Sequence, residues 1–301
     1  MNDPTHLIVG PGALGRLLAL HLADTAPVVL AGRRTLPSEQ TLTTPEGTQR
    51  TRHLVTTEVA TLPPMTPAYL HLTTKAYAAE AAYSAVMARL SGTPTLVLWQ
   101  NGYQIQPELT HRHPGPVLCA STTEGAWLAG DEGVVHAGRG VTYIGDLAKR
   151  HASLCQELAA LFVQAGLTAE AVADIDVRLW HKLAVNAAIN PLVARFRIRN
   201  GQLRDRPFRP MVERVVDEVA AIMAAEGITP PAAGWHALVW QVVAGTASNR
   251  ASMLQDVLAE RPTEREAILG PLIAAAHRHG IEVPSLSELD GHLSRPAPPW
   301  R

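Results

Sequence analysis

The sequence predicts an α/β protein with a parallel sheet in its N-terminal half and an all-helical C-terminal half. Three observations predict this fold class. Short apolar runs alternate with helical stretches up to about residue 167, a glycine-rich turn follows the first run, and strand signals fade beyond about residue 173. We therefore expect a doubly wound sheet domain over residues 1–173 and a helical domain over residues 174–301.

Four strands and two connecting helices are predicted in the first domain. The strands are short and mostly apolar, as strands buried on both faces are; they cover residues 6–9, 27–30, 68–72 and 95–98. The helices are rich in Ala and Leu and cover residues 13–23 and 78–90. Two later runs, 133–136 and 140–145, are separated by glycines and predict an antiparallel pair that closes the domain.

Four long helices are predicted in the second domain, over residues 176–193, 210–226, 234–245 and 264–280. Cys119 and Cys155 lie in apolar segments without CxxC spacing, so both are predicted to be core residues. The His-x-His pairs do not share a helical face, and no acid or cysteine completes a ligand set. We expect no metal.

The charge balance excludes several classes of partner. The chain has 26 Lys and Arg residues against 27 Asp and Glu residues, with no cluster of like charge, so we expect neither nucleic acid nor a membrane surface as partner. No apolar stretch approaches the length of a membrane span. The start, Met1 to Pro4, lacks the basic flank of a secretory signal, so we expect a cytoplasmic protein.

A glycine motif marks the first turn. Gly10-Pro11-Gly12-Ala13-Leu14-Gly15 lies between the first strand and the first helix, which is the setting of a Rossmann-type dinucleotide site. The first glycine permits the turn, the second leaves room for a pyrophosphate, and the third lets helix and strand approach. Free N–H groups at the helix start then face the phosphates. A glycine-rich turn without a ligand is the alternative.

The second strand indicates which dinucleotide is bound. Where a site selective for NAD carries an acid, this chain has Arg33 and Arg34. A guanidinium offers a planar set of donors and a fixed charge, which suits a 2'-phosphate. The pair therefore predicts NADP(H), with two solvated loop arginines as the alternative.

A polar stripe lies on an otherwise apolar helix. Lys182, Asn186 and Asn190 are spaced four residues apart, within about 80° of one helical face. Such a helix should be buried, so the ammonium and the two amides must find partners or line a cleft. A partly desolvated lysine has a lowered pKa and can donate a proton. A structural polar network or a subunit contact is the alternative.

Other polar residues have stronger structural explanations than the stripe. Ser252 with Gln255, and Thr263 with Glu266, fit capping boxes, which would make Ser252 an N-cap and Glu264 a first-turn acid. Lys75 and Asn101 each follow a predicted parallel strand, at the carboxyl edge where doubly wound sheets bind ligands.

Taken together, these residues resemble the ketopantoate reductase family, within the wider 6-phosphogluconate dehydrogenase-like group. The resemblance covers nearly the whole chain. It rests on the glycine motif, Lys75 in Thr74-Lys75-Ala76, Gln100-Asn101-Gly102, the Lys182 stripe followed by Pro191, Asn200-Gly201, and the run from Asn249 to Asp256 followed by Thr263-Glu264.

The resemblance implies a set of roles. Lys182 would be the general acid, and Asn101 would sit where cofactor and substrate meet. Substrate would be held by Lys182, Asn186, Asn190, Ser252 and, as a weaker match, Asn200. The cofactor would be held by the following residues: Gly10, Pro11, Gly12, Ala13, Leu14, Gly15, Arg33, Arg34, Lys75, Asn101, Ala126 and Glu264.

The implied reaction is the NADPH-dependent reduction of a 2-oxo acid, 2-dehydropantoate to (R)-pantoate, as in pantothenate biosynthesis. Two alternatives stay open: a related dehydrogenase of another 2-hydroxy acid, and a non-catalytic protein that senses NADP. The sequence leaves the oligomeric state open, with a homodimer through the helical domain as one expectation.

Overall fold

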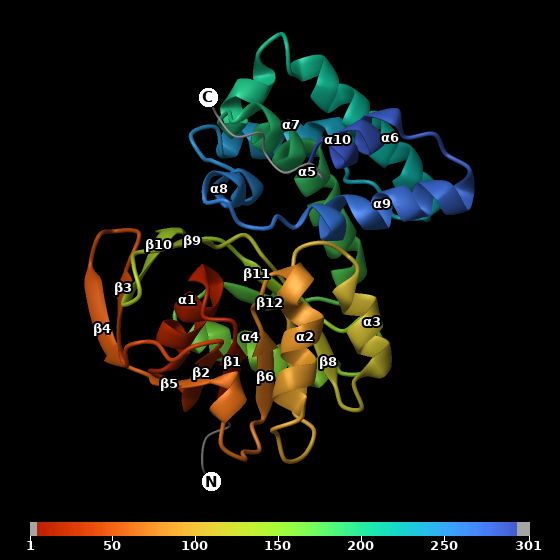
Figure 1. The fold of residues 1–301 in the computed structure, drawn as a ribbon. Helices are drawn as coiled ribbons and strands as arrows, with labels where there is room; N and C mark the ends of the chain where they lie inside the picture. The colour runs from red at the N-terminus through yellow and green to blue at the C-terminus, as the bar shows by residue number, and fades with distance from the viewer. Residues whose placement is uncertain (1–4, 294–301) are drawn as a thin grey trace. The chain divides into compact units, whose positions relative to one another are not determined.

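The computed structural model describes residues 5–293, and the chain forms two compact units (Figure 1). Unit 1 comprises Met1–Gln100 and Ile105–Asp176, and unit 2 comprises Asn101–Gln104 and Val177–Arg301. Met1 to Pro4, on which the expectation about a secretory signal rests, lie outside the described residues.

A sheet of eight strands forms the centre of unit 1 within the described residues. Its order is β12-β11-β8-β7-β6-β1-β2-β5. All neighbouring strands are parallel except β8 and β11. The strands are β1 (His6–Val9), β2 (Val28–Gly32), β5 (Val55–Glu58), β6 (Tyr69–Leu72), β7 (Thr95–Leu98), β8 (Val117–Thr122), β11 (Thr142–Gly145) and β12 (Ala169–Ala171).

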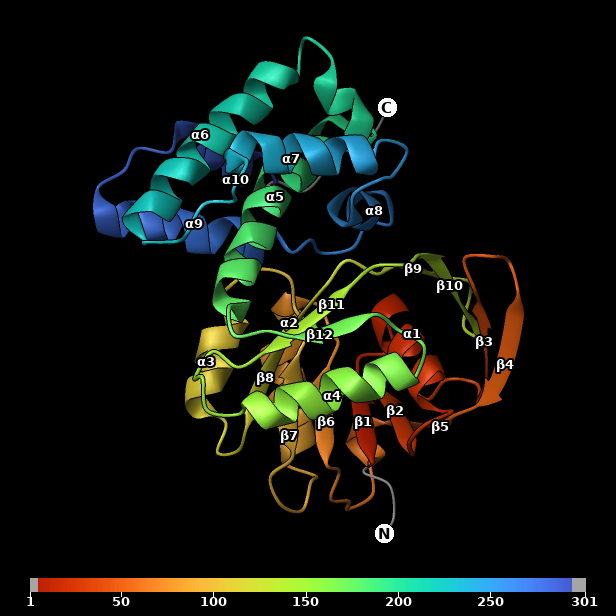
Figure 2. The same ribbon diagram turned by 180° about the vertical axis from the view of Figure 1, so that it is seen from behind.

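Helices cover both faces of this sheet, which explains why β1, β6 and β7 are buried along their whole length. The helices of unit 1 are α1 (Ala13–Leu22), α2 (Ala76–Met87), α3 (Ile105–Arg112) and α4 (Ala152–Gln164), with a short 3-10 turn η1 (Val59–Thr61). Figure 1 shows α2 in front of the sheet, and Figure 2 shows α4 on the opposite face. The predicted α/β organisation is confirmed.

A second sheet lies beside α1 in unit 1. Its order is β4-β3-β10-β9, and α1 contacts three of its strands as well as β1 and β2 of the first sheet. The strands are β3 (Glu39–Thr43), β4 (Gln49–His53), β9 (Gly125–Leu128) and β10 (Gly133–Gly138). Helix α1 is therefore held between two sheets.

The predicted pairing of residues 133–136 with 140–145 is wrong. These segments form β10 and β11, which follow one another in the chain but belong to different sheets. Strand β10 pairs with β9, and β11 pairs with β8, so the glycines between them mark a bend from one sheet to the other. A Cβ at Gly140 would stand 2.3 Å from the carbonyl carbon of Thr123, so the bend needs a glycine for close packing.

Unit 2 is helical throughout its described part. Its helices are α5 (Ile175–Phe196, which begins in unit 1), η2 (Asn200–Arg204), α6 (Arg209–Ala225), α7 (Gly234–Gly245), α8 (Ser252–Leu258), α9 (Arg265–His279) and α10 (Pro284–Leu293). Helix α5 continues through Pro191 and carries much of the apolar core of this unit. The four predicted helices correspond to α5, α6, α7 and α9.

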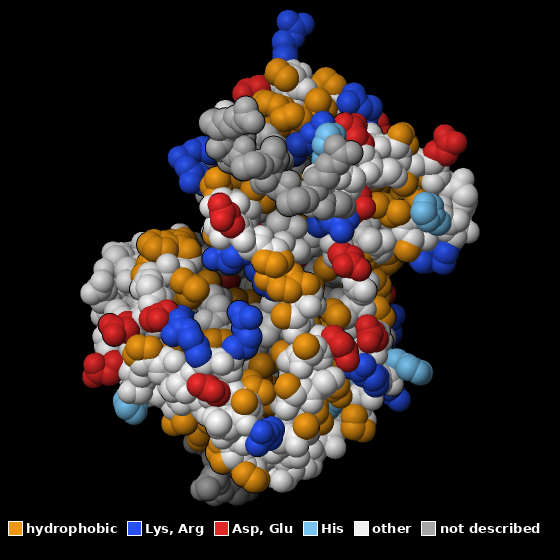
Figure 3. All heavy atoms as spheres, viewed as in Figure 1, with side chains coloured by type: hydrophobic (Ala, Val, Ile, Leu, Met, Phe, Trp, Pro, Cys, Tyr) orange, Lys and Arg blue, Asp and Glu red, His pale blue; other side chains and the backbone are white. Residues whose placement is uncertain are grey.

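The surface and the cysteines agree with the composition. Figure 3 shows acidic, basic and hydrophobic side chains interspersed on one face of each unit. No helix within residues 5–293 is long and apolar enough to cross a membrane. Cys119 and Cys155 are buried and free, which confirms that they are core residues.

A buried histidine pair joins neighbouring strands of the large sheet. The Trp99 indole N–H donates to Nδ1 of His71 over 3.2 Å, so the proton of His71 is on Nε2. That nitrogen lies 2.9 Å from Nδ1 of His6 and donates to it. The remaining proton of His6 is therefore on Nε2, a buried atom without a partner among the described residues. Both imidazoles are held neutral.

Acidification is predicted to destabilise unit 1 through His6. Burial lowers the pKa of His6 from 6.5 to about 4, so the unfolded chain binds this proton more tightly than the folded chain. The resulting stability is complete above pH 6.5 and is lost as the pH falls through 4, by about 3 kcal/mol at most. Urea unfolding across this range measures it. His6→Gln should reduce the pH dependence and leave the part that buried His71 contributes, because burial lowers the pKa of His71 as well. His53→Gln, at an exposed site on β4, should leave the dependence unchanged, and an equal dependence in all three proteins contradicts the assignment.

Candidate active site

The glycine turn of unit 1 is packed against the backbone that follows β6. Gly10 has a φ of +112°, and a Cβ there would stand 2.6 Å from the amide nitrogen of Thr74. A Cβ at Gly15 would stand 2.2 Å from the carbonyl oxygen of Gly10. No side chain fits at either position, so the fold itself requires these two glycines.

Gly12 differs from its two neighbours in the motif. A Cβ at Gly12 would meet nothing within 4 Å, so internal packing does not require a glycine there. Gly12 is the N-cap of α1, no side chain caps the helix, and the first turn contains no acid. The first N–H groups of α1 are thus left to an external acceptor, and the space beside Gly12 fits a pyrophosphate.

The two arginines after β2 are both exposed but differ in their surroundings. Arg33 makes no hydrogen bond or ion pair with any described residue, whereas Nη2 of Arg34 lies 2.5 Å from Oδ1 of Asp131. The segment stays close to the glycine turn, because a Cβ at Gly32 would stand 2.7 Å from the ring of Pro11. One arginine is therefore available to a ligand, and the other already has an anionic partner.

Two further predicted cofactor residues lie in unit 1. Lys75 is the N-cap of α2, directly after Thr73 and Thr74, on which the glycine turn packs. Ala126 lies on β9, opposite His136 in the second sheet. The carboxylate of Glu124 closes the adjoining bend, since it accepts hydrogen bonds from Nε2 of His136 at 2.6 Å and from the Gly140 amide at 2.8 Å.

Unit 2 brings together three of the predicted site residues. Glu264, the N-cap of α9, is 5% exposed, and its Oε2 accepts a hydrogen bond from the Asn101 amide over 3.0 Å. Lys182, on α5, lies close enough for the charge of Glu264 to act on it. An ammonium, a carboxylate and an amide, from three separate segments, therefore form one cluster.

The loop Asn101–Gln104, which provides the side-chain amide of Asn101, packs closely on other parts of unit 2. Gly102 has a φ of +90°, and a Cβ there would stand 2.2 Å from the carbonyl oxygen of Ala267 on α9. The Tyr103 ring packs on Trp180 of α5 with centroids 4.6 Å apart. Both contacts fix Asn101, which follows directly on Gln100 of unit 1.

Burial gives Lys182 its chemistry. Lys182 is half-buried, and burial lowers its pKa from 10.5 to about 8, while the negative charge of Glu264 acts in the opposite direction. The protonated and deprotonated forms of the Lys182 amine are therefore both accessible near neutral pH. The chain has three lysines among its 26 Lys and Arg residues: Lys75, Lys149 and Lys182.

The rest of the polar stripe lies on the same helix as Lys182. Asn190 is 7% exposed and Asn186 is half-buried, yet neither amide hydrogen-bonds to another described residue. A buried amide without a partner is costly unless a ligand or water bonds to it. The stripe is therefore equipped to bind a small polar molecule.

Both predicted capping boxes are wrong. Ala251, not Ser252, is the N-cap of α8, because its carbonyl accepts the amide of Gln255 and its own backbone is not helical, with a ψ of 151°. Helix α9 begins at Arg265 after Glu264, so Thr263 does not cap it. The Ser252 hydroxyl makes no hydrogen bond to a described residue and is free to bind a ligand.

Asn200 has a structural role. Its Nδ2 donates to Oγ1 of Thr246 over 2.9 Å, and its backbone amide donates to the carbonyl of Asn249. These bonds join η2 to the end of α7. Its Oδ1 is buried without a partner among the described residues, so one acceptor of the amide stays unused.

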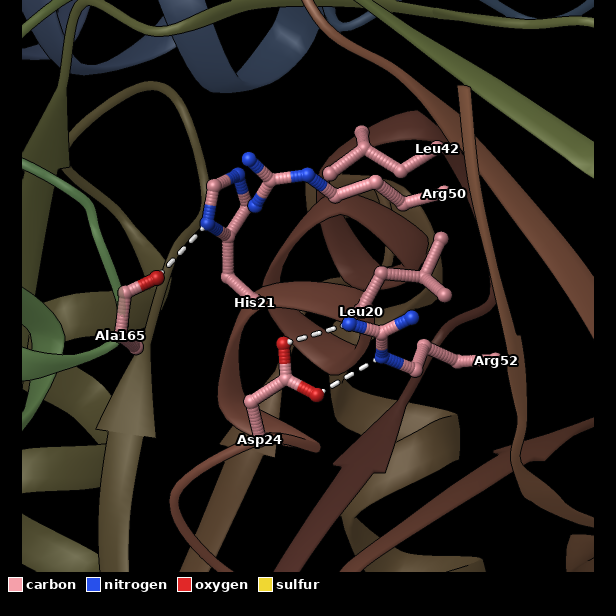
Figure 4. Close-up of a pocket in the computed structure, with 7 residues that line it drawn as sticks. All are labelled: Leu20, His21, Asp24, Leu42, Arg50, Arg52 and Ala165. Atoms are coloured by element: carbon pink, nitrogen blue, oxygen red, sulfur yellow. Dashed lines mark hydrogen bonds and ion pairs between the residues drawn. The ribbon is translucent and has the colours of Figure 1, made fainter. Parts of the chain in front are cut away.

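Two pockets in the described part of unit 1 are lined by none of the predicted site residues. Figure 4 shows the first, where Asp24 forms two bonds to Arg52, and His21 bonds to the carbonyl of Ala165 beside the side chain of Arg50. The second is a neighbouring groove of about 310 Å³ that shares His21 and Arg50. Among residues 5–293 no group of His, Cys, Asp or Glu could hold a metal ion.

Comparison with known proteins identifies the family. The family model described as ketopantoate reductase PanE/ApbA matches residues 6–149, and the one described as ketopantoate reductase PanE/ApbA C terminal matches residues 174–294. A 2-dehydropantoate 2-reductase of Vibrio cholerae is 37% identical over 290 residues, 94% of each chain. The chain belongs to the ketopantoate reductase family. Membership makes it an oxidoreductase, as the resemblance implied.

Solved structures of ketopantoate reductases share the fold. A family member from Ralstonia eutropha has a TM-score of 0.86 at 22% identity, and the dimeric ketopantoate reductase from Staphylococcus aureus has 0.80 at 22%. D-mandelate dehydrogenase with NADH and anilino(oxo)acetate has 0.85 at 20%. Each comparison covers 96% of this chain and 97% of the other. The Rossmann-type fold with a helical second domain is confirmed.

Glu264→Gln is predicted to lower the pKa of Lys182 below about 8, because the charge of Glu264 opposes the effect of burial. Isotope-labelled methylation of the lysines followed by NMR titration measures this pKa, and Lys182→Arg assigns the signal. Glu266→Gln, an exposed acid in the next turn of the chain, is the matched control. A pKa that is unchanged or raised in Glu264→Gln would show that the carboxylate does not act on Lys182.

Proposed function

We propose that the chain reduces 2-dehydropantoate to (R)-pantoate with NADPH, with Lys182 as the general acid. The observation that carries this proposal is the half-buried ammonium of Lys182, whose pKa is lowered to about 8 beside Glu264 and Asn101. A proton donor works best when its pKa lies near the working pH. The relatives named 2-dehydropantoate 2-reductase support the choice of substrate.

The residues of unit 1 fit a nicotinamide dinucleotide. The open space at Gly12 and the uncapped start of α1 accommodate its pyrophosphate, with Pro11, Ala13 and Leu14 completing the turn. Lys75 and Ala126 would contact the cofactor from neighbouring segments, and Glu264 and Asn101 would do so from unit 2. When bound, the cofactor supplies a hydride to the carbonyl carbon of the substrate.

The residues of unit 2 hold the substrate and move the proton. Lys182 donates its proton to the carbonyl oxygen, which becomes the hydroxyl of the product. The amides of Asn186 and Asn190, which bond to no other residue within 5–293, bind the carboxylate and hydroxyl of the substrate together with the Ser252 hydroxyl, and so fix the carbonyl. Asn101 holds Glu264, which keeps Lys182 protonated. Asn200 supports the site from η2.

The proposal also covers the location of the protein in the cell and its oligomeric state. We place the reaction in the cytoplasm, where free thiols such as Cys119 and Cys155 stay reduced. A homodimer is supported by the dimeric relative of the same fold. The intact Lys182 disfavours a protein that only senses NADP, since binding alone needs no proton donor.

Lys182→Ala is predicted to reduce turnover by about 10² to 10⁴ while NADPH binding is retained. The measurement is the loss of NADPH absorbance with 2-dehydropantoate, run beside a panel of other 2-oxo acids that would reveal a different substrate. In the parent protein the rate of reduction should fall as the pH rises through about 8, because Lys182 must be protonated to act. Undiminished turnover in Lys182→Ala removes this residue from the mechanism.

Arg33→Ala is predicted to weaken NADPH binding far more than NADH binding, since only NADPH carries the 2'-phosphate. Titration of each cofactor against the protein, followed by fluorescence, gives both dissociation constants. Arg89→Ala, another exposed arginine of unit 1, serves as control. Equal losses for the two cofactors would mean that Arg33 binds some other group.

A further inference from the structure

An ion pair lies beside the proposed 2'-phosphate site. Nη2 of Arg34 and Oδ1 of Asp131 are 2.5 Å apart, and the two side chains are 59% and 55% exposed. Arg34 follows β2, whereas Asp131 lies in the turn between β9 and β10, 97 residues further along the chain. No sequence motif of this chain points to Asp131.

Buried side chains fix the position of Asp131. Nη1 of Arg16 donates to its backbone carbonyl over 2.8 Å and to that of Gly130 over 3.0 Å. Nε2 of Gln40 donates to the same Asp131 carbonyl over 2.9 Å. Arg16 is 2% exposed and Gln40 is fully buried, so both donor side chains are shielded from water.

The same arginine holds the glycine turn. Nε of Arg16 donates to the carbonyl of Pro11 over 3.0 Å. One guanidinium therefore connects the turn proposed to hold the pyrophosphate with the turn that carries Asp131. The bonds that hold the backbone of Asp131 are thus separate from the bond between its carboxylate and Arg34.

The carboxylate of Asp131 occupies donors of Arg34 that a 2'-phosphate would otherwise use. An exposed ion pair contributes little stability, so a ligand can displace it at small cost. A 2'-phosphate that approached Arg34 would nevertheless meet a carboxylate competing for the same guanidinium donors. NADH, which has no such phosphate, would leave the pair intact.

We propose that Asp131 is a specificity-determining residue that weakens the preference for NADPH by competing with its 2'-phosphate for Arg34. This inference rests on the proposed function, since it assumes that the dinucleotide binds at the glycine turn. Arg33, which has no partner among the described residues, binds the phosphate unopposed. Arg34 contributes less to phosphate binding, because Asp131 occupies part of its guanidinium.

Asp131→Asn tests the competition. The substitution removes the charge but keeps the size of the side chain and the backbone carbonyl that Arg16 and Gln40 hold. We expect the dissociation constant of NADPH to fall about fivefold, the upper range for an exposed ion pair, and that of NADH to stay unchanged. Both are measured by cofactor titration without substrate, and Asp131→Glu should restore the parent values.

Glu132→Gln is the matched control, because this neighbouring exposed acid loses the same charge. If it tightens NADPH as much as Asp131→Asn does, the effect is general electrostatics and the competition is refuted. Arg34→Ala should weaken NADPH more in the Asp131→Asn background than in the parent. Equal losses in both backgrounds also overturn the proposal.

The outcomes separate this inference from the proposed function. If Arg33→Ala weakens NADPH while Asp131→Asn leaves it unchanged or weaker, the cofactor site stands and the role of Asp131 falls. If the parent protein binds neither NADPH nor NADH, the proposed function itself fails. Tightening of both cofactors alike by Asp131→Asn would refute selectivity for the 2'-phosphate.

Discussion

Unit 1 depends on one contact, in which the glycine turn lies against the backbone after β6 more closely than any side chain permits. Gly10 approaches Thr74, and Gly15 approaches Gly10, so a side chain at either position would block the turn that leads into α1. Arg16, in the first turn of α1, is consequently buried between the two sheets, where it holds Pro11 and the β9–β10 turn. The open space at Gly12, where we propose that the pyrophosphate binds, is thus a product of the packing that the neighbouring glycines allow.

Sequence patterns predicted those parts of the fold that depend on residues close together in the chain. Strands buried on both faces, such as β1 and β7, are continuous apolar runs, and the glycine motif has few other uses between a strand and a helix. Strand pairing is not local. Gly138 and Gly140 look like a turn in the sequence, but a bend between two sheets needs glycines equally. Strand β4, Gln-Arg-Thr-Arg-His, has no apolar alternation and could not be found by periodicity.

The candidate site, like the fold, was predictable from the sequence where it depends on local spacing and not where it depends on tertiary packing. The Lys182 stripe follows from helical spacing, and Arg33 from its place after β2. The capping boxes failed because α8 and α9 begin one residue away from where their side chains suggest. Asp131 could not be inferred at all, since its position next to Arg34 depends on the β9–β10 turn and on Arg16 and Gln40 beneath it.

The different uses of arginine and lysine explain the electrostatics of both units. Arg16 is almost fully buried, and its guanidinium makes several hydrogen bonds to backbone carbonyls, so it remains a permanent cation that supports structure. An arginine at position 182 would also remain charged and could not release a proton. A lysine there responds to burial with a pKa of about 8, and Glu264 prevents it from falling further. Because Asn101 bonds to that same carboxylate, the loop that follows β7 helps to set the charge state of Lys182, the proposed proton donor.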